Sequence, residues 1–454
     1  MRPSVLLVLF DDLRTNSSAL PLHMPRLAAL GREGTTYALA VANYPVCAPS
    51  RTMLLTGRFL QVAPESPQEA ENAKRLATKT LLRYFQNNGY ATYAAGKVFD
   101  GLLEGAWTAS LKFDARRTKC QDSRSERRNE PRCAPVIDTV DAAPARWLCE
   151  RIRRHDVKKK PFLAAFGLRR PHAPWEYAAE HYEDKSLPPS PTFPADAPLV
   201  SWSDNWGRVA KRSGNKGRCP TPKGGLPPPR LAQHFRGAYA ASCQTADTYL
   251  GRVLDACDAR TDNLVVAVTS DHGMHLGDHG IWSKQTLFDY SLRVPLILRG
   301  PGVPIRVVDT PVETARLFST LSFLAGLEVP PGVEPVLPPF GPSTPARSFY
   351  TRPCAGFESI RFASCLADKA AWPKVIGCHP GERLWGRSLR TATHRYTEYA
   401  VGDHLRGVQL YRYGNGDLDA AGAERLNLAS IVAPAVLGAW RDRLRRAFNA
   451  SGGS

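Results

Sequence analysis

The strongest constraint on the fold is a series of short apolar runs, rich in β-branched residues, that alternate with helical segments through the first two thirds of the chain. Such runs are typical of strands buried on both faces of a sheet, and the intervening helices favour a mostly parallel sheet covered on both sides. We expect strands at residues 5–10, 37–41, 90–94, 162–167, 264–269 and 295–298. We expect helices at residues 24–30, 79–86, 143–153, 234–257 and 312–324.

The alternation ends at a proline-rich stretch, "VPPGVEPVLPPFGPSTP", which breaks the periodicity and predicts a boundary. Beyond it, "RSLRTATHRYTEYA" and "GVQLYRYGNGDLDA" alternate in polarity like antiparallel strands, and residues 432–448 have the pattern of a closing helix. The 454 residues leave room for one large domain with an appendage. We therefore expect an α/β domain over 1–328, a connector over 329–345, and a smaller α+β domain with an antiparallel sheet over 346–454.

The chain is strongly basic, with a formal net charge of +18 and its densest runs at residues 115–132 and 151–160. This charge attracts polyanions, whether nucleic acid, sulfated glycan or phosphorylated ligand, or it belongs to a solvated surface insertion. No RNA-binding aromatic motif or zinc-finger spacing accompanies the charge, so we expect no specific nucleic acid partner. No run of about 18 apolar residues occurs, and we expect no membrane span.

Ten cysteines are many for a cytosolic enzyme of this size, and several fall in loop-like sequence where disulfides would close loops. These are Cys120, Cys133, Cys354, Cys365 and Cys378. Asn16 and Asn449 begin glycosylation sequons that would be used only in a secreted chain. The six-residue apolar run near the start leads directly into two aspartates, so it is interpreted as a strand, and any secretion signal was removed or never present. We expect the secretory pathway, with a lysosomal or extracellular destination.

Polar residues follow four of the predicted strands directly. In open α/β sheets ligands bind beyond the carboxyl ends of the strands, so side chains at these positions should gather at one edge. The residues concerned are Asp11, Asp12, Lys97, Arg169, Arg170, His172, Asp271 and His272. Carboxylates stand at the first and last of these ends, with basic side chains between them.

Three converging carboxylates, those of Asp11, Asp12 and Asp271, would repel one another and tend to protonate unless a cation joined them. A divalent metal resolves this repulsion. Oxygen ligands favour calcium or magnesium, and His272 as a fourth ligand would admit zinc or manganese. The pattern therefore predicts a metal site at this edge.

The segment "PVCAPSRTMLLTGR" places Cys47 just before Pro49, a good first residue for a helix. The backbone N–H groups of residues 50–55 would then point toward the sulfur and form a site for an anion. Arg51 and a nearby cation would also favour a thiolate at Cys47. A soft thiolate is a poor match for a hard, oxygen-rich metal site, which indicates that the working group is not sulfur.

The stretch "CAPSRTMLLTGR" (residues 47–58) resembles the C-x-P-S-R…T-G-R signature of the type I, formylglycine-dependent sulfatases. The resemblance continues through "VLLVLFDDLR", "NNGYATYAAGKVF", "LRRPHAPW", "TSDHGMHLGDHGIWSK" and "SLRTATHRYTEY". The iduronate-2-sulfatase branch is nearest in look, through its "DDLR", "GKVF", "PHxP" and "HGxW-x-K" forms. The resemblance implies the alkaline-phosphatase-like fold, an α/β sandwich with a mostly parallel central sheet.

The resemblance also implies a set of site residues. Asp11, Asp12, Asp271 and His272 match the family's metal ligands, with the modified Cys47 completing the shell around one divalent cation, usually Ca²⁺, with Mg²⁺ as the alternative. Arg51, Lys97, His172 and Lys284 match residues that hold the aldehyde hydrate and the sulfate. The resemblance further implies that a formylglycine-generating enzyme makes the aldehyde from the cysteine. In that family one hydroxyl of the aldehyde hydrate attacks sulfur, and the second expels sulfate as the aldehyde re-forms.

The chain departs from the family at one position. A histidine usually follows the lysine of "GK" by two or three residues, whereas Phe99 and Asp100 stand here. His275 is one candidate to replace it, although for His275, His279 and His234 we favour structural or surface roles.

Several other residues carry open or minor interpretations. Trp175 and Trp282 either line a sugar subsite or pack in the core. Cys120 and Cys133 resemble a family disulfide in position, and Cys243 and Cys257 are interpreted as buried thiols on one long helix.

The sequence therefore predicts a sulfatase acting on a sulfate ester, with a sulfated sugar or polysaccharide as the expected substrate. Two alternatives remain open. One is a phosphodiesterase or phosphonate monoester hydrolase of the same fold. The other is a sulfatase-like chain whose cysteine stays unmodified and which only binds polyanions.

Overall fold

The computed structural model describes residues 2–61, 79–100, 109–112, 139–186, 193–194, 196–202, 229–354, 378–379, 381–414 and 424–449. Its central sheet has the strand order β12-β2-β11-β7-β1-β6-β4-β5. The strands are β1 (Ser4–Asp11), β2 (Thr35–Tyr37), β4 (Ala91–Gly96), β5 (Ala109–Lys112), β6 (Phe162–Pro171), β7 (Leu264–Ser270), β11 (Leu296–Arg299) and β12 (Arg306–Val308). The predicted mostly parallel sheet is confirmed.

Strand β11 is the exception, since it runs antiparallel to both of its neighbours, β7 and β2. A parallel return would need a crossover, usually a helix, to carry the chain back to the other end of the sheet. Between β7 and β11 the chain forms only β8 (His275–Leu276), β9 (Trp282–Ser283), the four-residue α8 (Asp289–Leu292) and β10 (Arg293–Val294), with a 3₁₀ turn at Asp278–Gly280. The chain therefore re-enters the sheet from the edge at which it left.

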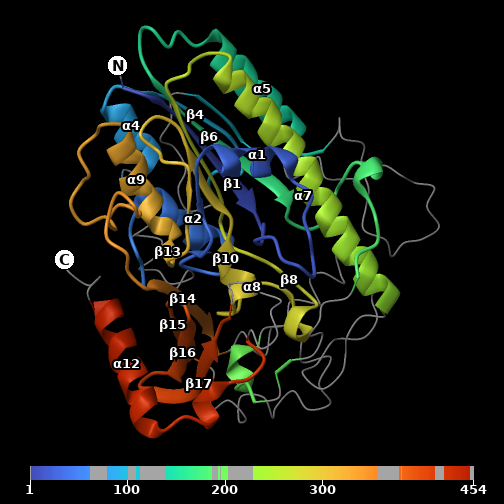
Figure 1. Cartoon of the computed structure of the whole chain (residues 1–454), viewed down its shortest axis with the longest axis vertical. Helices are drawn as coiled ribbons and strands as arrows, with labels where there is room; N and C mark the ends of the chain where they lie inside the picture. The colour runs from blue at the N-terminus through green and yellow to red at the C-terminus, as the bar shows by residue number, and fades with distance from the viewer. Residues whose placement is uncertain are drawn as a thin grey trace.

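Helices cover both faces of the sheet (Figure 1). Along β1, Leu6, Val8 and Phe10 pack in one core with residues of α1 (Pro25–Glu33), α5 (Ala142–Arg154) and α7 (Pro229–Asp258). Val5, Leu7 and Leu9 pack in a second core with residues of α2 (Cys47–Thr56), α4 (Leu81–Asn87) and α9 (Leu317–Leu324). Successive side chains of a strand point to opposite faces, which is why a continuous apolar run builds two cores.

Two sequence expectations were wrong. Residues 37–41 are not one strand, because β2 ends at Tyr37 and Ala40–Val41 forms β3 in a separate sheet of order β10-β3-β13. Residues 312–324 are not one helix, because Val312–Glu313 is strand β13 and a 3₁₀ turn at Thr314–Arg316 precedes α9. Pairing of β13 with β3 supplies the backbone partners that the first helical turn would otherwise need.

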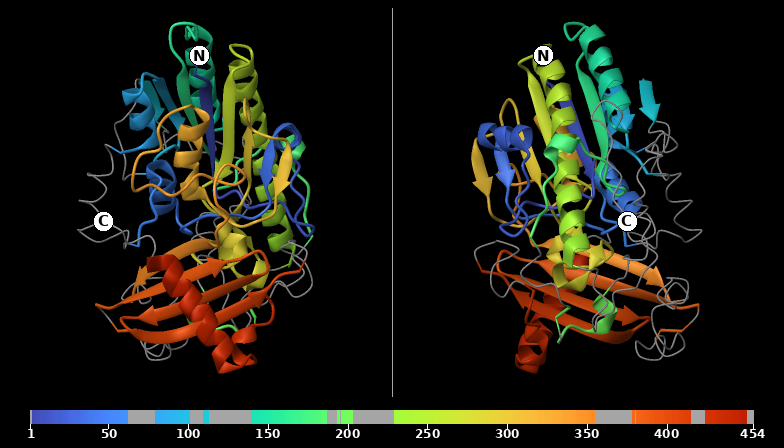
Figure 2. Two further views of the ribbon diagram at one scale, coloured as in Figure 1. Left: turned by 60° about the vertical axis from the view of Figure 1, so that its left-hand side comes forward. Right: turned by 90° about the vertical axis from the view of Figure 1, so that its right-hand side faces the viewer.

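A four-stranded antiparallel sheet forms the C-terminal region, as expected, and its strands run across the direction of the central strands (Figure 2). It consists of β14 (Ala346–Pro353), which the sequence analysis missed, β15 (Arg383–Arg390), β16 (His394–Val401) and β17 (His404–Arg412). Helix α12 (Pro434–Asn449) covers one face, with Leu444 and Phe448 in the same core as Leu389 and Tyr396. A disulfide joins Cys354 and Cys378, whereas Cys120, Cys133 and Cys365 lie outside the described residues.

Residues 329–345 form no helix or strand. We propose this segment as the boundary between a domain over 1–328 and a smaller one over 346–454. Arg347 links the first region to the second through Glu313 at 2.7 Å, and it also contacts Glu334 of the segment itself at 2.6 Å. Of the two basic runs, residues 151–160 form the last turn of α5 and the loop after it, with mostly exposed side chains, and 115–132 lie outside the described residues. Among the helices that the structure describes, none is both long and apolar enough to cross a bilayer.

Candidate active site

The site lies where four parallel strands end. Because β1, β4, β6 and β7 run in one direction, their carboxyl ends meet at one edge of the sheet. Gly167 is required for this approach, since a Cβ there would lie 1.9 Å from the carbonyl carbon of Lys97. The Lys97 amide donates to the Gly167 carbonyl at 2.7 Å, and this contact directs the chain after β4 toward β1.

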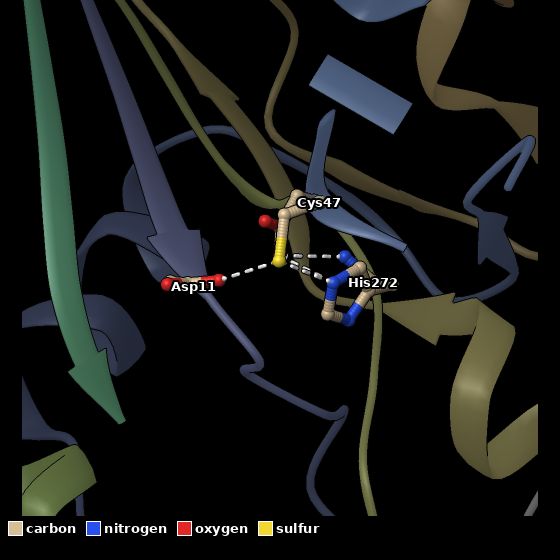
Figure 3. Close-up of side chains that lie close together, drawn as sticks. Asp11, Cys47 and His272 are labelled. Carbon is tan, nitrogen blue, oxygen red and sulfur yellow. Dashed lines mark hydrogen bonds and ion pairs between the residues drawn. The ribbon is translucent and has the colours of Figure 1, made fainter. Parts of the chain in front are cut away.

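Cys47 lies at the centre of these strand ends. Helix α2 begins at Cys47 itself, rather than after it as expected from Pro49. Figure 3 shows the carboxylate of Asp11 and the ring of His272 facing the sulfur, which lies 3.3 Å from Asp11 Oδ1 and 3.3 Å from His272 Nε2. The Nζ of Lys284 approaches the same sulfur at 3.0 Å. The structure thus brings four distant parts of the chain to one atom.

Four cationic side chains contact the three buried carboxylates. Lys97 Nζ donates to Asp11 Oδ2 at 2.7 Å, Arg169 to the same oxygen at 2.9 Å, Lys284 to Asp12 Oδ1 at 2.5 Å, and Arg51 Nε to Asp271 Oδ2 at 2.9 Å. Lys97 also contacts Asp100 at 3.2 Å, but the Asp100 side chain is 42% exposed and therefore screened by water. The buried set carries one positive charge in excess, which favours an anionic ligand.

The charges around Asp11 and Asp271 favour the ionised form of these two carboxylates. Burial alone would raise the pKa of Asp11, but Lys97, His172 and Arg169 together hold it well below its usual value. Burial is likewise outweighed at Asp271, where His272 and Arg51 lower the pKa. The cations that join the carboxylates thus include side chains of the chain itself, beside any metal ion.

Without an ion at the site, the surroundings of Cys47 favour the thiol over the thiolate. Burial, and after it the Asp11 carboxylate, raises the pKa of Cys47 to about 12. Burial lowers the pKa of both His172 and His272, which favours the neutral ring. A neutral imidazole is the form that binds metal.

The donor set fits a divalent cation. One group of four residues, Asp11, Cys47, Asp271 and His272, offers ligand atoms that all lie within 4.8 Å of one another. Oxygen ligands of Ca²⁺ lie about 2.3–2.6 Å from the ion, so two ligands of one ion are at most about 5 Å apart. Asp12 falls in a second group, with Asp11 and His172. All five residues expected as ligands are therefore at the site. Asp12 Oδ1 lies closer to Lys284 Nζ, at 2.5 Å, than to His272 Nδ1 of the four-residue group, at 3.5 Å.

Two residues at the site were given no role in the sequence analysis. Arg169 lies near the end of β6, three residues before His172, and its contact with Asp11 could have been anticipated from its place after the predicted strand at 162–167. Asp100 contacts Lys97 and was noted only as a departure from the family.

The other histidines and tryptophans considered in the sequence analysis contact residues away from Cys47. His275 and His279 are fully buried rather than at the surface. His275 bonds Thr286 Oγ1 at 3.0 Å and the carbonyl of Asp278 at 3.1 Å, so it does not replace the family histidine beside Lys97. The third histidine, His234, is half-buried against Tyr182. Both tryptophans, Trp175 and Trp282, pack against Phe235, and the expected buried thiols, Cys243 and Cys257, are free and buried.

Comparison with known proteins gives the same family by sequence and the same fold by structure. The sequence model of the sulfatase family matches residues 3–327. Iduronate 2-sulfatase of Mus musculus is 28% identical, with 87% of this chain and 84% of the relative covered, and arylsulfatase K of Xenopus laevis is 25% identical, with 95% and 80% covered.

Among solved structures, the phosphonate monoester hydrolase of Silicibacter pomeroyi superimposes with a TM-score of 0.71 at 22% identity, covering 99% of this chain and 96% of its own. A 2-O GAG sulfatase gives a TM-score of 0.69 at 18% identity, covering 100% and 93%. These likenesses confirm the alkaline-phosphatase-like fold. Since the family match extends over most of the chain, the chain belongs to the sulfatase family and is a sulfuric ester hydrolase.

Proposed function

We propose that this chain hydrolyses a sulfate ester on a sulfated sugar or polysaccharide, using a formylglycine hydrate made from Cys47 by a formylglycine-generating enzyme. The observation that carries the proposal is the position of Cys47. Its side chain is at the first turn of α2, within 3.3 Å of Asp11, His272 and Lys284 side-chain atoms. A nucleophile at this position would meet a bound anion with positive charge already in place.

The cations have distinct tasks in this proposal. A sulfate ester resists attack because its oxygens repel a nucleophile, so fixed positive groups must offset that charge in the transition state. Lys97, His172 and Lys284 are the side chains that we assign to the sulfate and to the hydrate. The excess positive charge of the buried set supports this assignment.

Arg51 acts differently, because its guanidinium is fully engaged on the protein side. It contacts the Asp271 carboxylate and the backbone carbonyls of Phe10 and Lys97. We therefore assign Arg51 to fixing Asp271 and the start of α2, rather than to direct contact with the sulfate.

One divalent cation would be held by Asp11, Asp12, Asp271, His272 and the modified residue 47. We favour calcium over magnesium as this ion. When bound, such an ion polarises the attacking hydroxyl and the ester oxygens. The hard oxygen donors of the three aspartates suit either ion. The chain's own residues then orient residue 47, exclude water around it and compensate the charge of the ester.

The sugar as substrate is supported by the relatives. One carries the name iduronate 2-sulfatase, and a solved neighbour is described in complex with D-glucosamine-2-N,6-O-disulfate. The basic character of the chain suits a polyanionic substrate. The Cys354–Cys378 disulfide supports an oxidising compartment, for which we propose the secretory pathway with a lysosomal or extracellular destination.

A phosphonate monoester hydrolase or phosphodiesterase is the second candidate, favoured by the presence of phosphonate monoester hydrolases among the structural neighbours. The fold serves both chemistries, so substrate comparison separates them.

The test has two parts. Peptide mass spectrometry over Cys47, on protein from its native source, should show the mass loss of thiol-to-aldehyde conversion. The kcat/KM for an aryl sulfate should exceed that for an aryl phosphate diester and an aryl phosphonate. A strong preference for phosphorus would establish the second candidate. An unmodified Cys47 with no turnover would instead leave a polyanion-binding protein.

A further inference from the structure

Lys284 lies in a strained part of the backbone. Among the described residues, five that are not glycine have a positive φ: Asp12 (71°), His279 (55°), Ser283 (104°), Gln285 (74°) and Glu424 (49°). Two of them flank Lys284 directly. Residues with a Cβ rarely adopt these angles, and they persist only where surrounding contacts over-determine them.

Contacts within the segment itself give part of the support. His275 and Leu276 pair with Ser283 and Trp282 in the β8–β9 hairpin, and the Thr286 hydroxyl bonds both His275 and Ser291. The hairpin ends at Ser283, immediately before Lys284. On the side that follows Lys284, Thr286 is bonded within this same segment, and an anchor to the rest of the molecule is provided further along the chain.

That anchor is Asp289, at the first position of α8. Arg390 Nε, from β15, lies 3.2 Å from Asp289 Oδ2, and Arg395, from β16, donates to Asp289 Oδ1. The Glu424 carboxylate accepts the backbone N–H of Asp289 at 2.9 and 3.1 Å. We call Asp289, Glu424, Arg390 and Arg395 the clamp cluster; each of these side chains is at most 1% exposed.

The clamp cluster joins the C-terminal sheet to the segment that carries Lys284. Lys284 Nζ must meet Asp12 Oδ1 at 2.5 Å and the Cys47 sulfur at 3.0 Å, and only four residues separate it from Asp289. A displacement of about 1 Å at a catalytic group is enough to lower a rate by roughly 100-fold. Movement of Asp289 would therefore reach the catalytic centre.

We propose that Asp289 is a positioning residue for Lys284, and that the C-terminal sheet acts through Arg390 and Arg395 as part of the catalytic apparatus. For its effect on turnover, this inference rests on the proposed function. Its structural half, the ordering of residues 283–288, does not depend on which ester is hydrolysed.

The chain offers a matched control in Glu398, on the same strand as Arg395. The two residues are three apart, so their side chains lie on opposite faces of the sheet. Glu398 accepts from Arg441 Nε of α12 at 2.8 Å and from the Tyr396 hydroxyl at 2.7 Å. Glu398→Gln thus removes a partly buried ion pair of the C-terminal region on the side away from Lys284.

The experiment compares Asp289→Asn with Glu398→Gln in the full-length, matured protein. Hydrogen exchange of residues 283–288 should accelerate at least about tenfold in Asp289→Asn, and kcat should fall about 10- to 100-fold. In Glu398→Gln, both should change less than about twofold, whatever its unfolding temperature. Equal effects of the two variants, or unchanged exchange in Asp289→Asn, would overturn the proposal.

A double variant tests whether the effect passes through Lys284. In a Lys284→Ala background, adding Asp289→Asn should lower kcat/KM less than about threefold further, because coupled residues are not additive. A full additional loss would contradict the proposal. Faster exchange without any sulfate turnover in the wild type would defeat the proposed function while supporting the positioning role.

Two measurements cover the case in which Asp289→Asn does not fold. Arg395→Lys keeps the charge but loses the planar geometry of the guanidinium, and it should reproduce the local exchange increase. In the wild type, residues 283–288 should open together with β16 under increasing denaturant. Opening of 283–288 alone, at lower denaturant than β16, would overturn the inference.

Discussion

The active site and the clamp cluster are both buried assemblies of aspartate, glutamate, arginine and lysine, yet their charges balance differently. In the clamp cluster two carboxylates meet two guanidinium groups, all at most 1% exposed. At the active site three buried carboxylates meet four cations, and Arg169 and Lys284 keep 19% and 12% of their side chains exposed. A balanced, closed cluster stabilises the fold, whereas an unbalanced cluster with partly open cations has charge left for a ligand.

The largest expected effect concerns the residue around which the open cluster is built. Cys47→Ala should lower kcat at least about 1,000-fold, because no other group at the site can be the nucleophile. The fold should persist, since the change removes one sulfur, and circular dichroism with thermal unfolding checks this. Turnover near the wild-type level would show that residue 47 is not the nucleophile. The proposed difference between a ligand-binding active site and a structural clamp cluster would then lose its main support.

Metal removal should follow in size. Dialysis against a strong chelator should lower kcat/KM for an aryl sulfate by about 100-fold or more. The reason is that the site would lose the ion that offsets the negative charge of both the carboxylates and the sulfate ester. Adding back calcium or magnesium should restore activity. Removal of the metal should leave the hydrogen exchange of the strands that carry the clamp cluster unchanged. Full activity after exhaustive chelation would show that the four side-chain cations suffice.

Loss of a single cation comes next. Lys97→Ala removes the group that contacts Asp11 at 2.7 Å, and kcat/KM for an aryl sulfate should fall about 100-fold. Lys97→Arg should recover part of this loss because it keeps the charge. If Lys97→Ala lowered stability strongly and activity little, the site would behave like the clamp cluster, contrary to the comparison.

The clamp cluster should respond to acid. Burial raises the pKa of Asp289, but Arg390 and Arg395 outweigh it and hold the pKa at about 2. The unfolded state therefore binds the proton more readily, and this contribution, about 2 kcal/mol, is present above about pH 4 and lost as pH falls through 2. Urea unfolding from pH 7 to pH 2 should show the free-energy gap between wild type and Asp289→Asn narrowing below pH 4. A gap independent of pH would exclude an ionised Asp289.

The smallest effect is expected for Asp100, whose exposed side chain lies at the edge of the active site. Asp100→Asn should change kcat less than about threefold and lower KM slightly, since Lys97 keeps Asp11 and the site loses a screened negative charge. A tenfold or larger fall in kcat, corrected by Asp100→His, would instead give Asp100 the proton-transfer task of the family histidine.

Much of the active site was predictable from sequence, because its members stand at recognisable points. Asp11 ends an apolar strand, Lys97, His172 and Asp271 each follow one, and parallel strands bring such positions together. Lys284 had no such signal from strand periodicity and was found only through the family resemblance. The ionisation state of Cys47 was missed because it depends on burial and on Asp11, neither of which the local sequence reveals.

The clamp cluster was not predictable in the same way. Arg390 and Arg395 alternate with apolar residues in a strand pattern, and such a pattern gives arginine a solvent-facing position. Asp289 and Glu424 have no sequence neighbours that suggest a shared site. Only the packing of the C-terminal sheet against α8 brings the four residues of the clamp cluster together. Such tertiary contacts cannot be inferred from the local periodicity of the sequence. The same omission explains why residues 37–41 and 312–324 were misassigned.

The burial of Cys47 has a consequence for the order of events in the life of the molecule. Cys47 is 6% exposed and Arg51 is 1% exposed, so a second enzyme has no access to this turn once the chain has folded. Conversion of the thiol, as proposed above, must therefore happen before the chain folds. A molecule that folds before conversion keeps its sulfur and stays inactive. The active fraction of a preparation would therefore depend on the rate of conversion relative to the rate of folding.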